Sequence, residues 1–197
     1  MKLFTRLYDY TLSLSKHPQA ERYLFALSFA ESSFFPIPPD VMLVPMTLAK
    51  PQSGWRYAVL TTIASVIGGL LGYLIGLLAL ETIEPFLMQL GYWEGYLAAT
   101  GWFLEWGFLA VFIAGFSPIP YKVFTIAAGA LNMLLPAFIL ASLIGRGSRF
   151  FLVTGLLRWG GEPMEKKLRN HVEKIGWFFL VILVVFYIAI RIGIERV

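Results

Sequence analysis

Charged side chains inside apolar stretches are the residues of this chain most able to do chemistry. They are two carboxylates, Glu31 and Asp40, one ammonium, Lys122, and two guanidiniums, Arg146 and Arg149. A charge at the centre of a bilayer costs roughly 2.5–3.5 kcal/mol on insertion scales, so such groups usually line a cavity or pair with one another. Carboxylates can take up and release protons, and guanidiniums bind phosphate through two parallel hydrogen bonds. We therefore expect the carboxylates to serve in proton coupling and the three cations to bind an anionic headgroup.

Each of these residues also has a structural interpretation, which the sequence leaves open. Asp40 could cap backbone N–H groups near the neighbouring prolines. Lys122 could extend along its four-carbon stem to a membrane interface. Arg146 and Arg149 could anchor the cytoplasmic end of a crossing. Glu31 lies in the middle of an apolar run, where no helix end needs a cap, so a purely structural role is least expected for this residue.

The composition is that of an integral membrane protein. Hydrophobic residues make up 58% and charged residues 14% of the 197 residues, and the mean hydropathy is +0.71. Soluble domains are less apolar and more charged than this. The uncharged runs Tyr57–Leu80 and Val123–Gly145 are each long enough to cross ~30 Å of hydrocarbon as a helix. We predict an all-α membrane protein with a single domain.

Several function classes are disfavoured by what the sequence lacks. It contains no cysteine, which excludes disulfides and thiol chemistry. It has no cluster of metal-ligating residues, no glycine-rich phosphate loop and no nucleophile elbow, so we expect no metal, no cofactor and no enzymatic activity. The excess of basic residues indicates membrane orientation and contact with anionic lipids, with no nucleic acid as partner.

Two proline groups interrupt the apolar stretches and resemble each other. Pro36, Pro38 and Pro39 form the first group, and Pro118 and Pro120 form the second. A helix cannot continue through such prolines, so each group predicts a hairpin turn. The tripeptide Pro-Ile-Pro occurs in both, and the string ASVIG at 64–68 returns as ASLIG at 141–145. Such a repeat of broken apolar segments is typical of transporters built from two related halves, here 20–80 and 102–158.

The charge distribution predicts the orientation of the chain. Four glutamates and no basic residue lie between Glu81 and Glu105, whereas seven basic residues lie between Arg146 and Lys174. By the positive-inside rule the second region is cytoplasmic, and the basic N-terminal third lies on the same side. Tyr23–Ala49 is apolar with basic residues on both flanks. It is therefore predicted to enter from the cytoplasm, turn at the first prolines and return.

The second half is predicted to have the same arrangement in the opposite orientation. Trp106–Tyr121 should enter from the outside, turn at the second prolines and return through Val123–Leu135, after which Pro136 begins a crossing. Together the halves predict an inverted repeat, each with a re-entrant hairpin and a transmembrane helix. Outside the repeats we predict an interfacial amphipathic helix over 1–16, a cytoplasmic helix over 162–174 and a C-terminal transmembrane helix over 175–194.

The repeat also predicts which charged residues meet. Asp40 and Lys122 follow equivalent turns that enter from opposite sides, so we expect an ion pair between them near the midplane. Alignment of the two copies places Arg146 and Arg149 opposite Gly69 and Gly72. The first copy would use its glycines for close helix packing, while the second presents two guanidiniums on one helical face.

Two stretches carry a resemblance to a known family. The strings ESSFFPIPPD at 31–40 and FSPIPYKVFTIAAG at 116–129 resemble the DedA family, whose shared region is called the VTT or SNARE-associated domain, and most closely its YqaA branch. The resemblance covers roughly residues 20–160 and implies a multi-pass protein of the bacterial inner membrane with two facing re-entrant hairpins. The family's typical arginines beside the second turn are replaced here by Phe116 and Lys122.

What the resemblance implies about function is lipid transport. Family members are implicated in recycling of undecaprenyl phosphate, in phospholipid scrambling and in membrane homeostasis that depends on the proton-motive force. We therefore expect translocation of a lipid or lipid phosphate, with membrane lipids as partners and a cytoplasmic N-terminus. The alternatives are a proton-coupled antiporter of small solutes or ions, and a structural protein of envelope assembly without transport. The sequence leaves homo-oligomer formation open.

Overall fold

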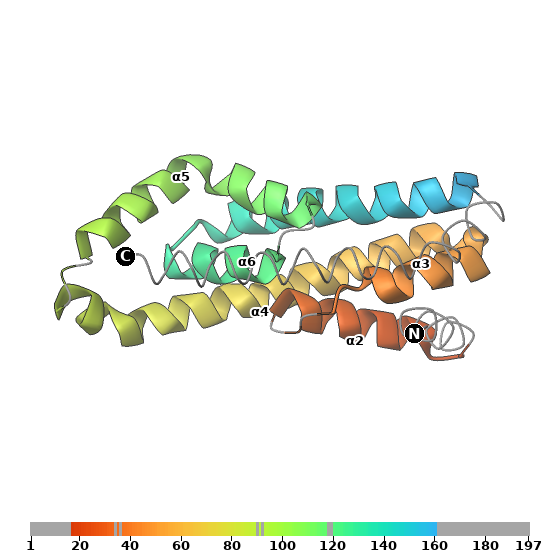
Figure 1. Ribbon diagram of the computed structural model, residues 1–197, viewed down its shortest axis with the longest axis horizontal. Coiled ribbons are helices and arrows are strands. Elements are labelled where there is room, and N and C mark those ends of the chain that lie inside the picture. Colours follow the sequence, from red (N-terminus) through yellow and green to blue (C-terminus); the bar gives the residue numbers. More distant parts are fainter. Residues whose placement is uncertain are drawn as a thin grey trace, which may run out of the picture.

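The computed structural model describes residues 17–160 except Phe34, Pro36, Leu90, Tyr92, Pro118 and Ile119 (Figure 1). Within these residues the secondary structure is helical, with no strand. The predicted helices over 1–16, 162–174 and 175–194, and the predicted turn residues Pro36 and Pro118, lie outside the described residues.

The described helices follow one another with short connections. In chain order they are α2 (Ala20–Ser33), α3 (Asp40–Ala49), the 3-10 turn η1 (Pro51–Ser53), α4 (Gly54–Gln89), α5 (Trp93–Phe116), α6 (Tyr121–Ala130) and a last helix, Leu135–Gly160. Prolines stand at the boundaries, as expected from their missing N–H group. Pro39 precedes α3, Pro120 precedes α6 and Pro51 follows α3.

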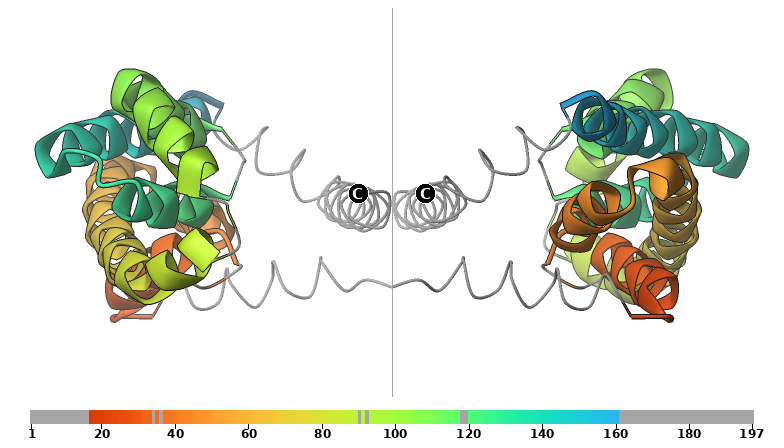
Figure 2. Two further views of the ribbon diagram at one scale, coloured as in Figure 1. Left: turned by 90° about the vertical axis from the view of Figure 1, so that its left-hand side faces the viewer. Right: turned by 90° about the vertical axis from the view of Figure 1, so that its right-hand side faces the viewer.

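The two short helices each belong to a hairpin, and the hairpins enter the bundle from opposite ends. In Figure 1, α2 and α3 lie at one end of the long axis, and their connecting turn points toward the middle. The α5–α6 hairpin comes from the other end, and its turn also lies near the middle. The end-on views of Figure 2 show the helices packed side by side. The two proline turns therefore lie near the middle of the bundle's long axis, where Phe35, Ile37 and Phe116 remain exposed.

Among the described residues, three helices are long and apolar enough to cross a membrane: Pro51–Leu80, Trp93–Phe116 and Leu135–Gly160. The first contains the predicted run Tyr57–Leu80. The run Val123–Gly145 is not one helix, because α6 ends at Ala130 and Asn132 adopts the left-handed conformation at φ 54°. The following crossing begins at Leu135, beside the predicted Pro136.

The entering arm of the second hairpin is longer than predicted. It begins at Trp93 rather than Trp106. Glu94 in the first turn is favoured by the helix dipole, and Glu105 lies at an exposed position along the helix. A single exposed carboxylate does not end a helix, so most of the acidic stretch between Glu81 and Glu105 is helical.

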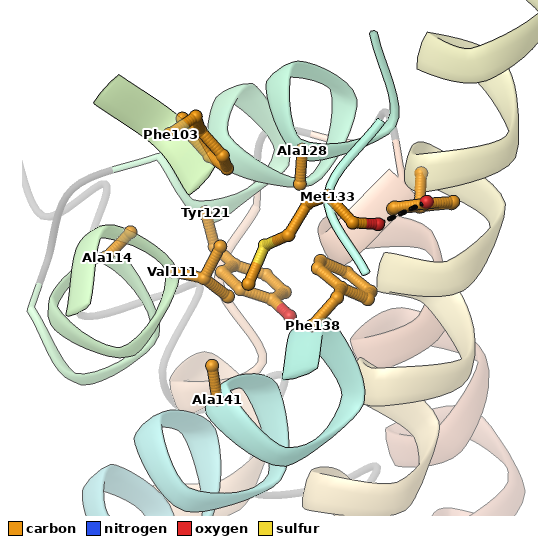
Figure 3. Packing of buried hydrophobic residues seen from close by; sticks show 9 residues of the cluster. Phe103, Val111, Ala114, Tyr121, Ala128, Met133, Phe138 and Ala141 are labelled. Carbon is orange, nitrogen blue, oxygen red and sulfur yellow. Dashed lines mark hydrogen bonds between the residues drawn. The ribbon is translucent and has the colours of Figure 1, made fainter. Parts of the chain in front are cut away.

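The core holds the second hairpin against α4 and the last helix (Figure 3). Tyr121 and Phe138 are fully buried there and face Val111 of α5 and Met133 of the turn after α6. The Tyr73 hydroxyl donates a 2.6 Å hydrogen bond to the Met133 carbonyl. This bond satisfies a backbone acceptor at the turn, where no helical partner exists.

A second cluster holds the first hairpin. Its fully or nearly fully buried residues come from α2, α3, α4 and the last helix, and include Leu24, Leu43, Met46, Tyr57 and Phe150. The last helix therefore contributes to both cores and connects the two hairpins.

Glycines allow the helix backbones to touch. A Cβ added at Gly68 of α4 would collide with the Phe29 carbonyl of α2, and one at Gly145 of the last helix would collide with the Phe112 carbonyl of α5. These two glycines end the repeated strings ASVIG and ASLIG. Gly76 packs in the same way against the Ile126 carbonyl of α6. Such contacts replace the hydrophobic effect as the source of helix association in lipid.

Gly76→Ala should therefore destabilise the fold, whereas Gly101→Ala should not. The added methyl at Gly76 meets backbone that cannot give way, and overpacking of this kind typically costs about 1–3 kcal/mol. At Gly101 nothing lies within 4 Å, and alanine is favoured over glycine in a helix by roughly 1 kcal/mol. Unfolding in detergent, titrated with a denaturing surfactant, measures both changes. Equal unfolding midpoints for the two variants would contradict the packing described here.

Candidate functional site

Arg146 of the last helix lies at the centre of a buried polar cluster. Its side chain is 2% exposed. The Nε atom donates a 2.6 Å hydrogen bond to the Ser65 hydroxyl of α4, and Nη2 lies 2.5 Å from Oε2 of Glu31 in α2. Arg146 therefore joins three helices. A buried charge without such partners would be very unfavourable, and the Glu31 carboxylate, 14% exposed, supplies the opposite charge.

Serine hydroxyls extend the cluster in one direction. The Ser65 and Ser32 hydroxyl oxygens lie 2.5 Å apart, and the Ser32 hydroxyl donates to the Glu31 carboxylate at 3.1 Å. Because Ser65 accepts from Arg146, its own proton is free to point toward Ser32. The hydroxyls thus form a hydrogen-bonded chain from the guanidinium to the carboxylate.

Aromatic rings cover the guanidinium of Arg146. Its Cζ atom lies 4.9 Å from the ring centroid of Tyr121 and 4.8 Å from that of Phe150. The negative faces of both rings stabilise the cation. The Tyr121 hydroxyl donates to the Ser142 hydroxyl at 2.5 Å, so that the ring is held in place by a polar contact as well as by packing.

Arg149, one turn further along the last helix, connects the two proline turns. Its Nη2 atom donates to Oδ2 of Asp40 at 2.8 Å, and Nη1 donates to the Ser117 carbonyl at 2.9 Å. Asp40 is the first residue of α3, after the first turn, and Ser117 directly follows α5, at the second turn. The Arg149 and Asp40 side chains are 20% and 22% exposed. This pair can therefore be reached from outside the protein, unlike Arg146.

Lys122 lies across the same junction. Its Nζ atom donates to the Phe35 carbonyl of the first turn at 3.3 Å. Within the residues that the structure describes, Lys122 has no carboxylate at ion-pair distance, whereas Arg146 and Arg149 each have one. The described part of the site thus holds three cations against two carboxylates.

The predicted site residues are thus brought together, with different partners from those expected. The expected ion pair between Asp40 and Lys122 is wrong, because the longer, forked side chain of Arg149 pairs with Asp40. Lys122 does contact the opposite turn, through a backbone carbonyl. Asp40 is not the capping residue of α3, which begins after Pro39 without a side-chain cap. Arg146 is not an interfacial anchor, because its side chain is buried against Glu31.

Sequence reasoning missed the neutral residues of the site. These are Ser32, Ser65, Tyr121 and Ser142. Ser32 bonds to Ser65, Ser65 accepts from Arg146, and Tyr121 donates to Ser142. The repeat carried a usable signal for two of them, because Ser65 and Ser142 are the serines of ASVIG and ASLIG. A polar residue kept in both copies of an apolar motif indicates a hydrogen-bonding task.

Taken together, the helices and this buried site define a multi-pass helical membrane protein. Residues 37–159 match the VTT domain. The chain therefore belongs to the VTT-domain, or DedA, family.

Relatives cover most of the chain. An uncharacterized protein of Haemophilus influenzae is 48% identical over 191 residues, which are 97% of this chain and 100% of that protein. The undecaprenyl phosphate transporter A of Staphylococcus aureus is 29% identical over 178 residues, 85% of this chain and 88% of that protein. An alkaline phosphatase-like protein of Lactococcus lactis is 32% identical over 129 residues, 60% of each chain. No solved structure matches.

Proposed function

We propose that the protein moves a lipid with a phosphate-bearing headgroup across the bacterial inner membrane. The observation that carries this proposal is the Arg149–Asp40 pair, which lies at the junction of the two turns beside Lys122 and is partly exposed. A guanidinium fork matches two phosphate oxygens as well as it matches a carboxylate. The relative named as an undecaprenyl phosphate transporter supports this substrate class.

Proton coupling fits the same pair. When Asp40 is ionised it holds Arg149, and a phosphate has to displace it. When Asp40 is protonated the attraction falls, and Arg149 becomes free for the headgroup. A proton and a phosphate would then favour the same open state, which is the condition for coupling two ligands through one equilibrium. Glu31, paired with the buried Arg146, is the second candidate for proton uptake.

The arrangement in the membrane is part of the proposal. The opposite directions of the two hairpins along the bundle favour an inverted repeat with re-entrant hairpins that meet near the midplane. In this arrangement no covalent step is needed, because the residues of the site bind and release without transforming the lipid.

Reconstituted vesicles test the function. Vesicles with the purified protein would carry a fluorescent phospholipid or a fluorescent polyprenyl phosphate, and a membrane-impermeant quencher would report how much label reaches the outer leaflet. We expect label to be quenched beyond the outer-leaflet half, and faster with an inward proton gradient. Flux of a small solute without lipid movement would favour the antiporter. Movement of neither would favour the structural role in envelope assembly.

Topology gives a separate test. Residues 50–56 should face the cytoplasm, because basic residues lie on both flanks of Tyr23–Ala49. In the cysteine-free chain, Ser53→Cys should resist an impermeant thiol reagent added to intact cells. Gly95 lies near the start of α5, which in Figure 1 begins at the end of the bundle opposite α2 and α3; nothing lies within 4 Å of a Cβ added there, and Gly95→Cys should be labelled. Labelling of both positions to the same extent would overturn the re-entrant arrangement.

A further inference from the structure

Two buried threonines stand out because their hydroxyl groups have no partner. Thr47 of α3 and Thr154 of the last helix are both fully buried, and neither Oγ1 atom makes a hydrogen bond among the described residues. A helical threonine normally donates to the carbonyl four residues earlier. Thr61 and Thr62 of α4 do this, each at 2.7 Å. The two unpartnered hydroxyls are therefore available to donate to a water molecule or to a ligand.

These threonines lie next to each other although they are far apart in sequence. Both approach Gly54, the first residue of α4. A Cβ added there would lie 3.2 Å from the Thr47 methyl carbon and 2.9 Å from that of Thr154. The absence of a side chain at Gly54 thus leaves room for the two threonines between α3 and the last helix.

Polar groups continue along the same seam in both directions. Toward the middle of the bundle lies the Arg149–Asp40 pair, which joins the same two helices. Toward the end of the bundle, Nη1 of Arg158 lies 3.4 Å from the Gln52 carbonyl, and its guanidinium lies 5.1 Å above the Trp55 ring. We define the α3 seam as Asp40, Thr47, Arg149, Thr154 and Arg158. From the end of the bundle to its centre, it presents the Arg158 guanidinium, the two threonine hydroxyls and the Arg149 guanidinium, which is paired with the Asp40 carboxylate.

We propose that the α3 seam is the route along which the phosphate headgroup travels between the end of the bundle at Arg158 and the central Arg149. This inference rests on the proposed function and adds the path. The hydroxyls of Thr47 and Thr154 donate to phosphate oxygens during passage, which gives a partner to groups that otherwise have none. Arg158 receives the headgroup at the end of the seam.

The seam is closed in this structure and α3 is the side that can open it. Thr47 and Thr154 are buried, so a headgroup passes only when the two helices separate. α3 has ten residues and contains Pro45 in its interior. This proline removes one backbone hydrogen bond and weakens the helix two residues before Thr47. The last helix is 26 residues long and contributes residues to both cores, so it should stay in place while α3 moves.

The test compares isosteric variants in the vesicle assay. Thr47→Val and Thr154→Val remove the hydroxyls and keep the shape, and the double variant should lower the initial rate of lipid movement about tenfold or more. Thr61→Val and Thr62→Val are the matched controls, because their hydroxyls already have backbone partners, and their rates should stay within about twofold of wild type. Thr47→Ser with Thr154→Ser keeps both hydroxyls and should retain the wild-type rate.

Each outcome has a definite meaning. A double valine variant with the wild-type rate would overturn the seam as a route and leave lipid transport intact, and it would assign the hydroxyls to bound water alone. A serine variant as slow as the valine variant would also overturn it, because packing and not hydrogen bonding would then set the rate. Failure of the wild-type protein to move either lipid would instead remove the proposed function, and the route with it.

Discussion

Arg146→Met should leave little folded protein in the membrane. The substitution removes the guanidinium that joins α2, α4 and the last helix, and it leaves the Glu31 carboxylate and the Ser65 hydroxyl without their partner. Loss of one member of a buried ion pair typically costs about 3–5 kcal/mol. Unfolding in detergent and the yield of monodisperse protein measure the effect.

Two further variants make this prediction specific. The double change Glu31→Leu with Arg146→Met should recover most of the stability, because no unpaired charge remains. The Arg56–Glu21 pair is the exposed counterpart, with side chains 72% and 33% exposed. Arg56→Gln should cost less than about 1 kcal/mol, as exposed pairs generally do. If the exposed and the buried substitution proved equally costly, the buried cluster would not be what holds the helices together.

Arg149→Lys should fold and yet transport poorly. Arg149 donates at once to the Asp40 carboxylate and to the Ser117 carbonyl, with the two arms of one planar group. A lysine keeps the charge but offers a single point of donation, so it cannot reproduce the fork. Loss of one charge-assisted hydrogen bond should lower the initial rate of lipid movement about 10- to 100-fold.

The stability of the Arg149→Lys variant should change little, since the site is partly exposed and both side chains can be solvated. Arg56→Lys is the matched control for the chemical change and should transport at the wild-type rate. Asp40→Asn should behave differently from Arg149→Lys: it retains transport but loses its acceleration by a proton gradient. A variant Arg149→Lys with full activity would show that the fork does not bind the headgroup.

The sequence was informative about the helices because apolar runs and prolines act locally. The apolar run within α4 could be predicted from its length. The helix starts after Pro39 and Pro120 could be predicted because the missing proline N–H interrupts a helix whatever the tertiary structure around it. The start of α5 could not, since an isolated Glu105 is tolerated on an exposed helix face. The division of Val123–Gly145 near Pro136 could be predicted, but the end of α6 at Ala130 could not, because Asn132 takes a left-handed conformation without any glycine or proline at that position.

The residues of the site were predictable by type and not by pairing. A charge in an apolar segment requires a partner, so Glu31, Asp40, Lys122, Arg146 and Arg149 were identifiable individually. Which carboxylate meets which cation depends on how far each side chain reaches across the bundle. Thr47 and Thr154 carry no sequence signal, because a threonine whose hydroxyl lacks a partner looks like any other helical threonine.

The backbone contacts between α4 and α6 limit how these two helices can move relative to each other. Gly76 lies against the Ile126 carbonyl, and Gly129 of α6 lies against the Tyr73 carbonyl of α4. With backbone against backbone on both sides, neither helix can slide by one residue without driving a side chain into a carbonyl. α4 and α6 should then move together as one rigid unit, and under the proposed route a ligand that fixes α3 against the last helix should block lipid movement.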